Sequence, residues 1–110
     1  MQERKRHKLH YSREARRDLD AIWDFYLHAY QNCDAAVKII DSITEDIDRL
    51  ADYPELGPLL SSIADVEANV RFLVAGQYLS FYRIDGADLY IDRILYGRRD
   101  YLRILFGDAD

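Results

Sequence analysis

A pair of adjacent arginines stands near the end of the chain, in the segment Gly97-Arg98-Arg99-Asp100-Tyr101. Two neighbouring guanidinium groups on a turn can bind phosphate or carboxylate oxygens through paired N–H donors. The phenol of Tyr101 could stack on a nucleobase or donate a hydrogen bond. The alternative is structural: the arginines pair with acidic side chains of the helices, and Asp100 caps the segment that follows. The pattern alone leaves both interpretations open.

Three further arginines, Arg71, Arg83 and Arg93, fall one on each of three expected strands. If these strands are neighbours, the three side chains can share one sheet face and bind phosphates or an acidic peptide. The alternative is that they lie at strand edges and are solvated. Of the three, Arg71 is the strongest candidate for binding.

Aromatic side chains accompany these arginines along the same strands. Rings beside arginines can form stacking platforms for single-stranded RNA, but aromatics in strands more often belong to the core or form cross-strand pairs. We therefore expect core positions for most of them and a binding position for Tyr96, which stands beside the arginine pair. The set consists of Tyr78, Phe81, Tyr82, Tyr90 and Tyr96.

The three histidines, His7, His10 and His28, all precede the arginine-rich last third of the chain. Cleavage of RNA needs one group that takes the 2′-hydroxyl proton and another that protonates the leaving oxygen. Paired histidines are one common solution, and the last third contains none. The sequence also lacks a glycine-rich phosphate loop and the HExxH, CxxC and GxSxG motifs. We therefore expect neither a metal site nor a cofactor.

Apolar periodicity predicts two helices that would have to position these groups. Ser12 is a candidate N-cap, and apolar residues follow at helical spacing to Ala29. A second helix should start after a break at 31–34 and end before Pro54, because the residue before a proline disfavours helical backbone. The short joint predicts an antiparallel helical hairpin. The two apolar stripes are Ala15, Leu19, Ile22, Trp23, Tyr26 and Tyr30, and then Ala36, Ile39, Ile40, Ile43, Ile47, Leu50 and Ala51.

A run of strands is expected after a connecting loop at 54–70. Residues 71–74, 78–84 and 89–96 are rich in β-branched and aromatic types, and Asp85-Gly86 is typical of a tight turn. Residues 7–11 could form a short first strand, and residues 101–106 a short final helix or strand. The expected order is β-α-α-β-β-β. This is an α+β fold in which a helical hairpin packs on a small antiparallel sheet.

Length and composition predict one domain over residues 1–110, with residues 1–10 as a flexible basic arm. The charged N-terminus is not followed by an apolar stretch, so it does not look like a secretory signal. No apolar run approaches the roughly 18 residues that span a bilayer. The single cysteine, Cys33, permits no intramolecular disulfide and fits a reducing compartment. We expect a soluble, cytoplasmic protein without membrane contact.

The net charge of −5 is unevenly distributed along the chain. Residues 1–13 carry +4, residues 14–70 carry −9, and residues 71–110 are balanced by six arginines and six acidic side chains. A protein that binds polyphosphate over a broad surface is expected to be basic overall. This chain would need a local basic patch instead.

Ordered motifs from about Tyr11 to Phe106 resemble the RelE/ParE family of toxins from type II toxin–antitoxin systems. Their order and spacing together are specific for the family, although not for a branch within it. The resemblance implies the compact β-α-α-β-β-β toxin fold, a cognate antitoxin that wraps and neutralises the toxin, and contact with operator DNA only through the antitoxin. The motifs are Ser12-xx-Ala15-xx-Asp18-Leu19-xx-Ile22, Leu50-xxx-Pro54-xx-Gly57, Arg71-Phe72-Leu73, Tyr78-xx-Phe81-Tyr82-Arg83 and Ile94-Leu95-Tyr96-Gly97-Arg98-Arg99-Asp100.

The branches of this family differ in target: RelE-like members cut messenger RNA in the ribosomal decoding site, and ParE-like members inhibit DNA gyrase. RelE-like nucleases use basic residues, often lysines, on the central strands, and an arginine follows the tyrosine that matches Tyr78. Here Leu79 follows it, and no lysine occurs after Lys38. Some nuclease members, and many other members of the family, carry histidine where this chain has Tyr96. These departures favour a ParE-like toxin that inhibits a macromolecular target such as DNA gyrase.

Two alternatives stay open: a ribosome-dependent mRNA endoribonuclease, and a degenerate member that binds its antitoxin without being toxic. A nuclease would act through positioning and charge stabilisation. Its expected catalytic residues are Arg71, Arg98 and Tyr101. The expected target-binding residues are Arg83, Arg93, Tyr96 and Arg99.

Overall fold

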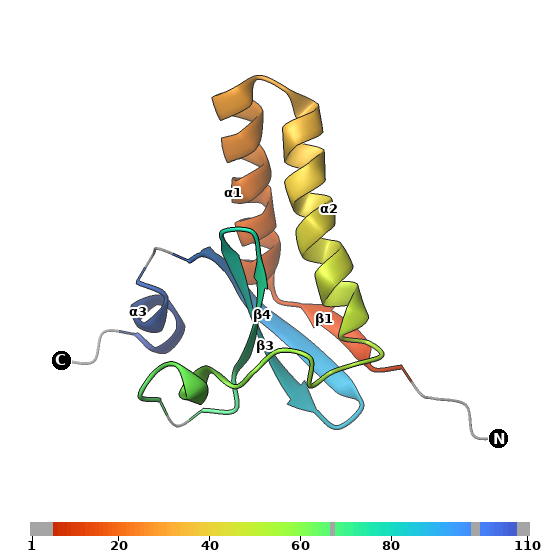
Figure 1. The fold of residues 1–110 in the computed structure, drawn as a ribbon, viewed down its shortest axis with the longest axis vertical. Coiled ribbons are helices and arrows are strands. Elements are labelled where there is room, and N and C mark those ends of the chain that lie inside the picture. The colour runs from red at the N-terminus through yellow and green to blue at the C-terminus, as the bar shows by residue number, and fades with distance from the viewer. Residues whose placement is uncertain (1–5, 67, 98–99, 108–110) are drawn as a thin grey trace.

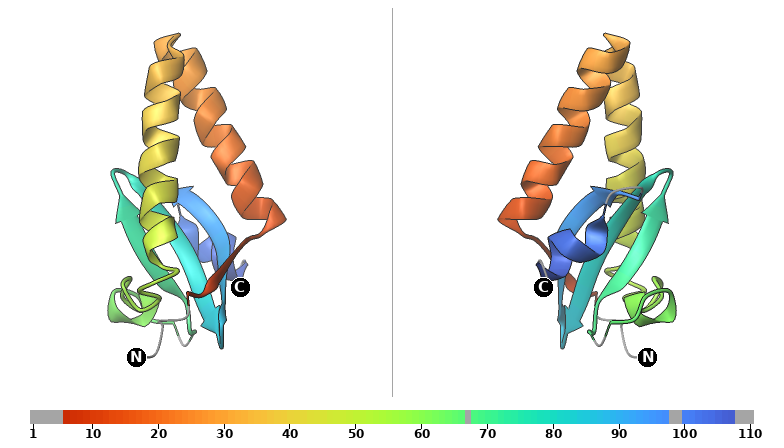
Figure 2. Two further views of the ribbon diagram at one scale, coloured as in Figure 1. Left: turned by 90° about the vertical axis from the view of Figure 1, so that its right-hand side faces the viewer. Right: turned by 90° about the vertical axis from the view of Figure 1, so that its left-hand side faces the viewer.

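The computed structural model describes residues 6–66, 68–97 and 100–107. A long helical hairpin stands on one side of a small sheet, and a short C-terminal helix lies on the other side (Figures 1 and 2). This arrangement confirms the predicted α+β fold. The elements are β1 (Lys8–Tyr11), α1 (Arg13–Tyr30), α2 (Cys33–Arg49), the 3₁₀ turn η1 (Leu60–Ser62), β2 (Arg71–Ala75), β3 (Tyr78–Asp85), β4 (Asp88–Tyr96) and α3 (Tyr101–Phe106).

The sheet has the strand order β1-β4-β3-β2 and is mixed. Strands β2, β3 and β4 pair antiparallel as predicted, whereas β1 pairs parallel with β4. The expectation of a wholly antiparallel sheet is wrong for this edge: the helical hairpin, β2 and β3 all lie between β1 and β4 in the chain, and so long a connection permits the parallel pairing that a tight turn excludes. Residues 8–10 form part of β1 and not of the expected flexible arm. Residues 1–5 of that arm lie outside the described chain.

Local signals in the sequence set the ends of the hairpin. The Ser12 hydroxyl accepts a hydrogen bond from the Ala15 N–H at 2.9 Å and donates to the Asp92 carbonyl at 2.7 Å. It therefore caps α1 and ties its first turn to β4. Asn32 caps α2 through the Asp34 N–H, after Gln31 ends α1 with a left-handed backbone. Within the described residues, no helix combines the length and apolar character needed to cross a bilayer.

Two hydrophobic clusters occupy the two faces of the sheet. The hairpin covers a cluster that includes Ile43, Ile47 and Tyr82. The opposite face carries a second cluster around Phe72 and Phe81, against which α3 packs. Successive strand residues point to opposite faces, so a sheet covered on both sides buries neighbouring side chains. Tyr78, Phe81 and Tyr82 are buried, which confirms the core positions predicted for them.

Candidate functional site

The three strand arginines do not share one face of the sheet. Arg71 lies opposite Tyr82, whose ring belongs to the hairpin-side cluster. Arg83 is the next residue along β3 and therefore points to the other face. Arg93 lies opposite Phe81, beside a register shift in the β3–β4 pairing, and its side chain reaches α1. The prediction that all three arginines share one face is therefore wrong: Arg71 lies on the hairpin side, whereas Arg83 and Arg93 line one hollow beside α3.

Each of these guanidinium groups has a partner within the chain. Arg71 Nη1 donates to the Gly57 carbonyl at 2.8 Å. Arg83 donates to both carboxylate oxygens of Asp92, at 2.6 Å from Nε and 3.0 Å from Nη2. The hydrogen bonds to Asp92 raise the pKa of Arg83 above its ordinary value. Arg71 thus fastens the loop after α2, and Asp92 offsets the charge of Arg83.

Arg93 connects the sheet to α1 through Asp18. Its Nε and Nη2 donate to the two Asp18 carboxylate oxygens at 2.8 and 2.9 Å. Asp18 Oδ2 also accepts the Ile94 N–H at 2.9 Å. The hydrogen bonds between Arg93 and Asp18 raise the pKa of Arg93 above its ordinary value. The target-binding roles expected for Arg83 and Arg93 stay predictions, and the geometry gives each of them a structural partner.

The C-terminal cluster is described only in part, since Arg98 and Arg99 lie outside the described residues. Asp100 is the N-cap of α3 and accepts the Arg103 N–H at 3.4 Å, which matches its predicted capping role. The ring of Tyr101 lies 5.4 Å from that of Phe81, centroid to centroid, in the second hydrophobic cluster. The aromatic face of Tyr101 is therefore used in packing α3 on the sheet.

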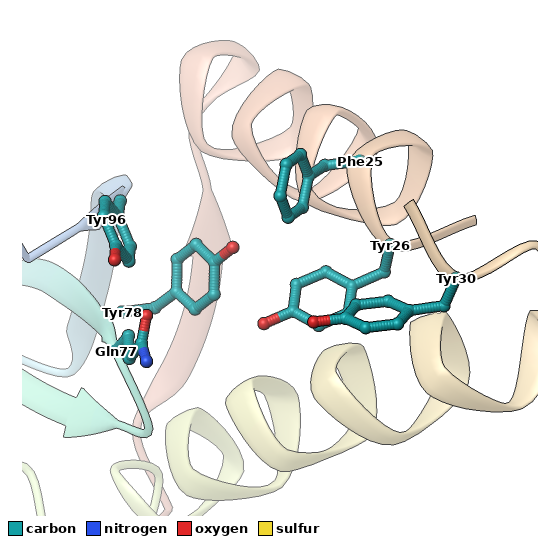
Figure 3. Close-up of a pocket in the computed structure, with 6 residues that line it drawn as sticks. All are labelled: Phe25, Tyr26, Tyr30, Gln77, Tyr78 and Tyr96. Atoms are coloured by element: carbon teal, nitrogen blue, oxygen red, sulfur yellow. The ribbon is translucent and has the colours of Figure 1, made fainter. Parts of the chain in front are cut away.

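Tyr96 lines a pocket at the junction of the hairpin and the sheet (Figure 3). Helix α1 contributes neighbouring rings near its C-terminal end, and Tyr78 and Tyr96 are cross-strand partners in β3 and β4. The β2–β3 turn adds one amide side chain. The cavity measures about 460 Å³ and is lined by Phe25, Tyr26, Tyr30, Gln77, Tyr78 and Tyr96.

Ring contacts connect the two walls of this aromatic pocket. The Tyr26 ring centroid lies 5.6 Å from that of Tyr30 and 6.4 Å from that of Tyr78. Tyr78 in turn lies 5.8 Å from Tyr96. Burial raises the pKa of Tyr78 to about 12, and the neighbouring Tyr26, Tyr96 and Tyr30 phenols add to the shift. The Tyr78 phenol is therefore neutral at physiological pH.

Sequence reasoning missed most of this pocket. Tyr26 and Tyr30 were expected in the apolar stripe that packs on the sheet, yet the Tyr30 side chain is 61% exposed. Phe25 is 60% exposed and lies outside that stripe. Three aromatic residues within six positions at the end of a helix were the signal available. Whether these rings meet Gln77 and Tyr78 depends on how the hairpin packs on the sheet, which the sequence does not show.

A shallower hollow of about 130 Å³ continues from the aromatic pocket along α1. The two hollows share Phe25, Tyr78 and Tyr96. The continuation extends to Asp18 and Ala21 on the helix and to Ile94 on β4. Together they form one groove between α1 and the sheet, which we call the α1 groove.

A helical hairpin on a mixed four-stranded sheet, with a groove at their junction, is the fold of a known class of toxin. Residues 9–101 match the family model described as the ParE toxin of the type II toxin–antitoxin system parDE. The chain therefore belongs to the ParE toxin family. It is a toxin of a type II toxin–antitoxin system, and the predicted family resemblance is confirmed.

Solved structures support the same assignment. The chain is similar to a chain of the chromosomal ParDE toxin–antitoxin system from P. aeruginosa, with 27% identity and a TM-score of 0.68 over 82% of this chain and 95% of that chain. It shares its fold with a chain of the RelBE2 toxin–antitoxin complex from Mycobacterium tuberculosis, with 19% identity and a TM-score of 0.54 over 83% of this chain and 98% of that one. No curated protein matches the sequence at a significant level.

Proposed function

We propose that this toxin arrests growth by binding a protein target such as DNA gyrase, and that a cognate antitoxin neutralises it. The observation that carries the proposal is the pairing of the strand arginines within the chain. Arg83 and Arg93 each share their charge with one carboxylate, and Arg71 donates to a backbone carbonyl. Asp92 and Asp18 each occupy two sites on their arginine and offset its charge, which weakens the attraction of these groups for a phosphate.

The charge around the groove also supports a protein target over RNA. Residues 13–49, which contain both helices of the hairpin, carry five basic and nine acidic side chains, a net charge of −4. Polyphosphate binding depends on cationic surfaces that release counterions. An acidic hairpin repels a phosphate backbone, whereas the surface of a protein partner can complement it.

Binding of a cognate antitoxin is supported by the relatives and by the groove. Both solved relatives described above come from toxin–antitoxin systems. An amphipathic segment that enters an apolar groove is a recurring mode of recognition between proteins. The α1 groove offers such a surface on the toxin.

The test is induced expression of the toxin without antitoxin, with pulse labelling of DNA and protein synthesis in the same cells. We expect DNA synthesis to fall first while translation continues. Purified toxin should also inhibit DNA supercoiling by gyrase in proportion to its concentration. An early fall in protein synthesis would overturn the proposal in favour of the mRNA endoribonuclease. Normal growth, with neither DNA nor protein synthesis reduced, would overturn the proposal in favour of a degenerate member that binds its antitoxin without being toxic.

Matched variants separate the two toxic mechanisms. If the chain cleaves RNA, Arg71→Ala or Arg98→Ala should abolish cleavage while leaving the fold intact. If it inhibits gyrase, Arg83→Gln tests the target-binding role expected for Arg83: weaker inhibition with the fold retained would assign it to the target interface, and unchanged inhibition would leave it only its pairing with Asp92. The double variant Arg98→Gln/Arg99→Gln tests the contact with the target expected from the sequence. If this variant no longer inhibits supercoiling while its free energy of unfolding is that of the wild type, the arginine pair is assigned to the target interface.

A further inference from the structure

The aromatic pocket has walls of ring faces and several inward hydroxyl groups. Figure 3 shows Tyr26 and Tyr30 extending from α1 toward the sheet, and the Tyr78 hydroxyl directed back toward the helix. Each phenol oxygen can accept a hydrogen bond, and so can the side-chain oxygen of Gln77. The pocket therefore combines stacking surfaces with several hydrogen-bond acceptors, which is typical of a binding site and unnecessary for a hydrophobic core.

The electrostatics of the pocket favour a cation. None of the six lining side chains is a carboxylate, an ammonium or a guanidinium group. The face of an aromatic ring carries partial negative charge and attracts cations that lie over it. Helix α1, which supplies three of the rings, belongs to the acidic hairpin with its net charge of −4. The ring faces of the pocket therefore attract a cationic group and repel an anionic one.

The shape of the pocket distinguishes between the two basic side chains. A guanidinium group is planar, stacks on aromatic rings and carries five N–H donors. It can lie between ring faces while its edges donate to phenol and amide oxygens. A lysine ammonium is a compact charge with a tightly held hydration shell, and it cannot stack. The chemistry of the lining therefore fits arginine better than lysine.

We propose that the aromatic pocket binds an arginine side chain of the antitoxin, whose adjoining residues lie along α1 in the groove. The inference rests on the proposed function, because it requires that the toxin bind an antitoxin. The hollow that continues from Phe25 toward Asp18 provides space for chain beside the arginine. The exposed rings of Phe25 and Tyr30 would be covered by the partner, which explains two large aromatic side chains at the surface.

The chemistry of the pocket is tested with a small probe. Wild-type toxin is titrated with N-acetylarginine amide and with its uncharged isostere N-acetylcitrulline amide, and the aromatic ring signals are followed by NMR. We expect saturable shifts at Tyr30 and Tyr96 with the arginine compound, and we expect the citrulline compound to bind more weakly by a factor of at least about ten. Equal binding of the two compounds, or shifts confined to rings outside the pocket, would overturn the proposal.

The assignment to the antitoxin is tested with the complete toxin–antitoxin complex. Tyr30→Leu removes one exposed ring, and Tyr53→Leu is the matched control because Tyr53 is 54% exposed and lies outside the pocket. We expect Tyr30→Leu to weaken antitoxin binding about tenfold and Tyr53→Leu to leave it unchanged. Arginine-to-glutamine substitutions in the antitoxin should identify one residue whose effect disappears in the Tyr30→Leu background.

The outcomes separate this inference from the proposed function. An antitoxin that binds wild type and Tyr30→Leu equally, with no coupled arginine, would overturn the inference and leave the proposed neutralisation intact. An antitoxin that fails to bind wild-type toxin would contradict the proposed neutralisation itself. Circular dichroism of Tyr30→Leu confirms that the fold is retained, as expected for an exposed side chain.

Discussion

Arg93 and Asp18 form a two-point ion pair that joins β4 to the second turn of α1, with N–O distances of 2.8 and 2.9 Å. The side chains are only 25% and 12% exposed. Because Asp18 also accepts the Ile94 N–H, one carboxylate fixes both the side chain and the backbone of β4. The pair lies beside the α1 groove, to which Asp18 contributes.

Asp18→Ala should therefore destabilise the fold more than an ordinary helix substitution. It leaves a largely buried guanidinium and one backbone N–H without their acceptor, at an expected cost of roughly 2–3 kcal/mol in the free energy of unfolding. Urea denaturation measures this cost. Asp20→Ala, at an exposed position of the same helix, is the control and should change stability by less than about 0.5 kcal/mol. Equal losses in the two variants would contradict the structural role of Asp18.

Tyr82→Phe should also destabilise the fold, although it removes a single oxygen atom. The buried Tyr82 hydroxyl accepts the Gly57 N–H at 2.9 Å and donates to the Pro54 carbonyl at 2.8 Å. Its loss leaves both backbone groups without this partner, for which we expect about 1–3 kcal/mol. Thermal and urea unfolding are the measurements. Tyr90→Phe, at a half-buried position, is the control. A similar loss of stability in Tyr90→Phe would show that the hydrogen bonds of Tyr82 to Gly57 and Pro54 add no measurable stability.

Gly57→Ala should be among the most damaging single substitutions in the chain. A Cβ atom at this position would lie 2.3 Å from the Phe72 carbonyl oxygen and 2.8 Å from the Tyr82 hydroxyl. Backbone atoms cannot move aside cheaply, so we expect a loss of at least about 3 kcal/mol or failure to fold. Gly86→Ala is the comparison. Its φ of +61° carries a conformational cost of about 1–2 kcal/mol, but there is open space around it. Comparable stability of the two variants would contradict the predicted clash.

Stability should fall at alkaline pH because of three tyrosines. Burial raises the pKa values of Tyr11 and Tyr78 from 10.0 to about 12 in the folded chain, and it also raises the pKa of Tyr82. The unfolded chain releases these protons first, so their contribution to stability is complete below pH 10 and is lost as the pH rises toward 12.

Urea denaturation across this pH range measures the decline. Tyr78→Phe removes one of the three ionisations and should make the decline shallower, even if the variant starts from a lower stability. An unchanged slope in Tyr78→Phe would assign the alkaline loss to other groups.

Local sequence signals were sufficient for most of the fold. The Ser12 cap, the break at 31–34 and the proline at 54 placed both helices within a few residues of their observed ends, because capping and backbone restrictions act over one turn of chain. The Asp85-Gly86 turn and the β-branched runs likewise placed β3 and β4. The order of motifs along the chain also identified the toxin family.

The arrangement of the candidate site depended on tertiary structure. Three arginines at strand positions predicted a common face, but faces follow from register, and the irregularity between Phe81 and Tyr82 is invisible in the composition of either strand. Arg93 pairs with Asp18, 75 residues away in the sequence, and Arg71 donates to Gly57, 14 residues away. Neither contact could be inferred from the spacing of residues along the chain.

The sequence by itself determined which residues are helical or extended and to which family the chain belongs, because these properties depend on local propensity and on the order of motifs. Only the tertiary structure decided which polar groups are already satisfied and where the aromatic rings meet. The aromatic pocket forms because α1 crosses the sheet beside Tyr78 and Tyr96. That crossing is fixed by the packing of many side chains from distant segments, and no short stretch of sequence records it.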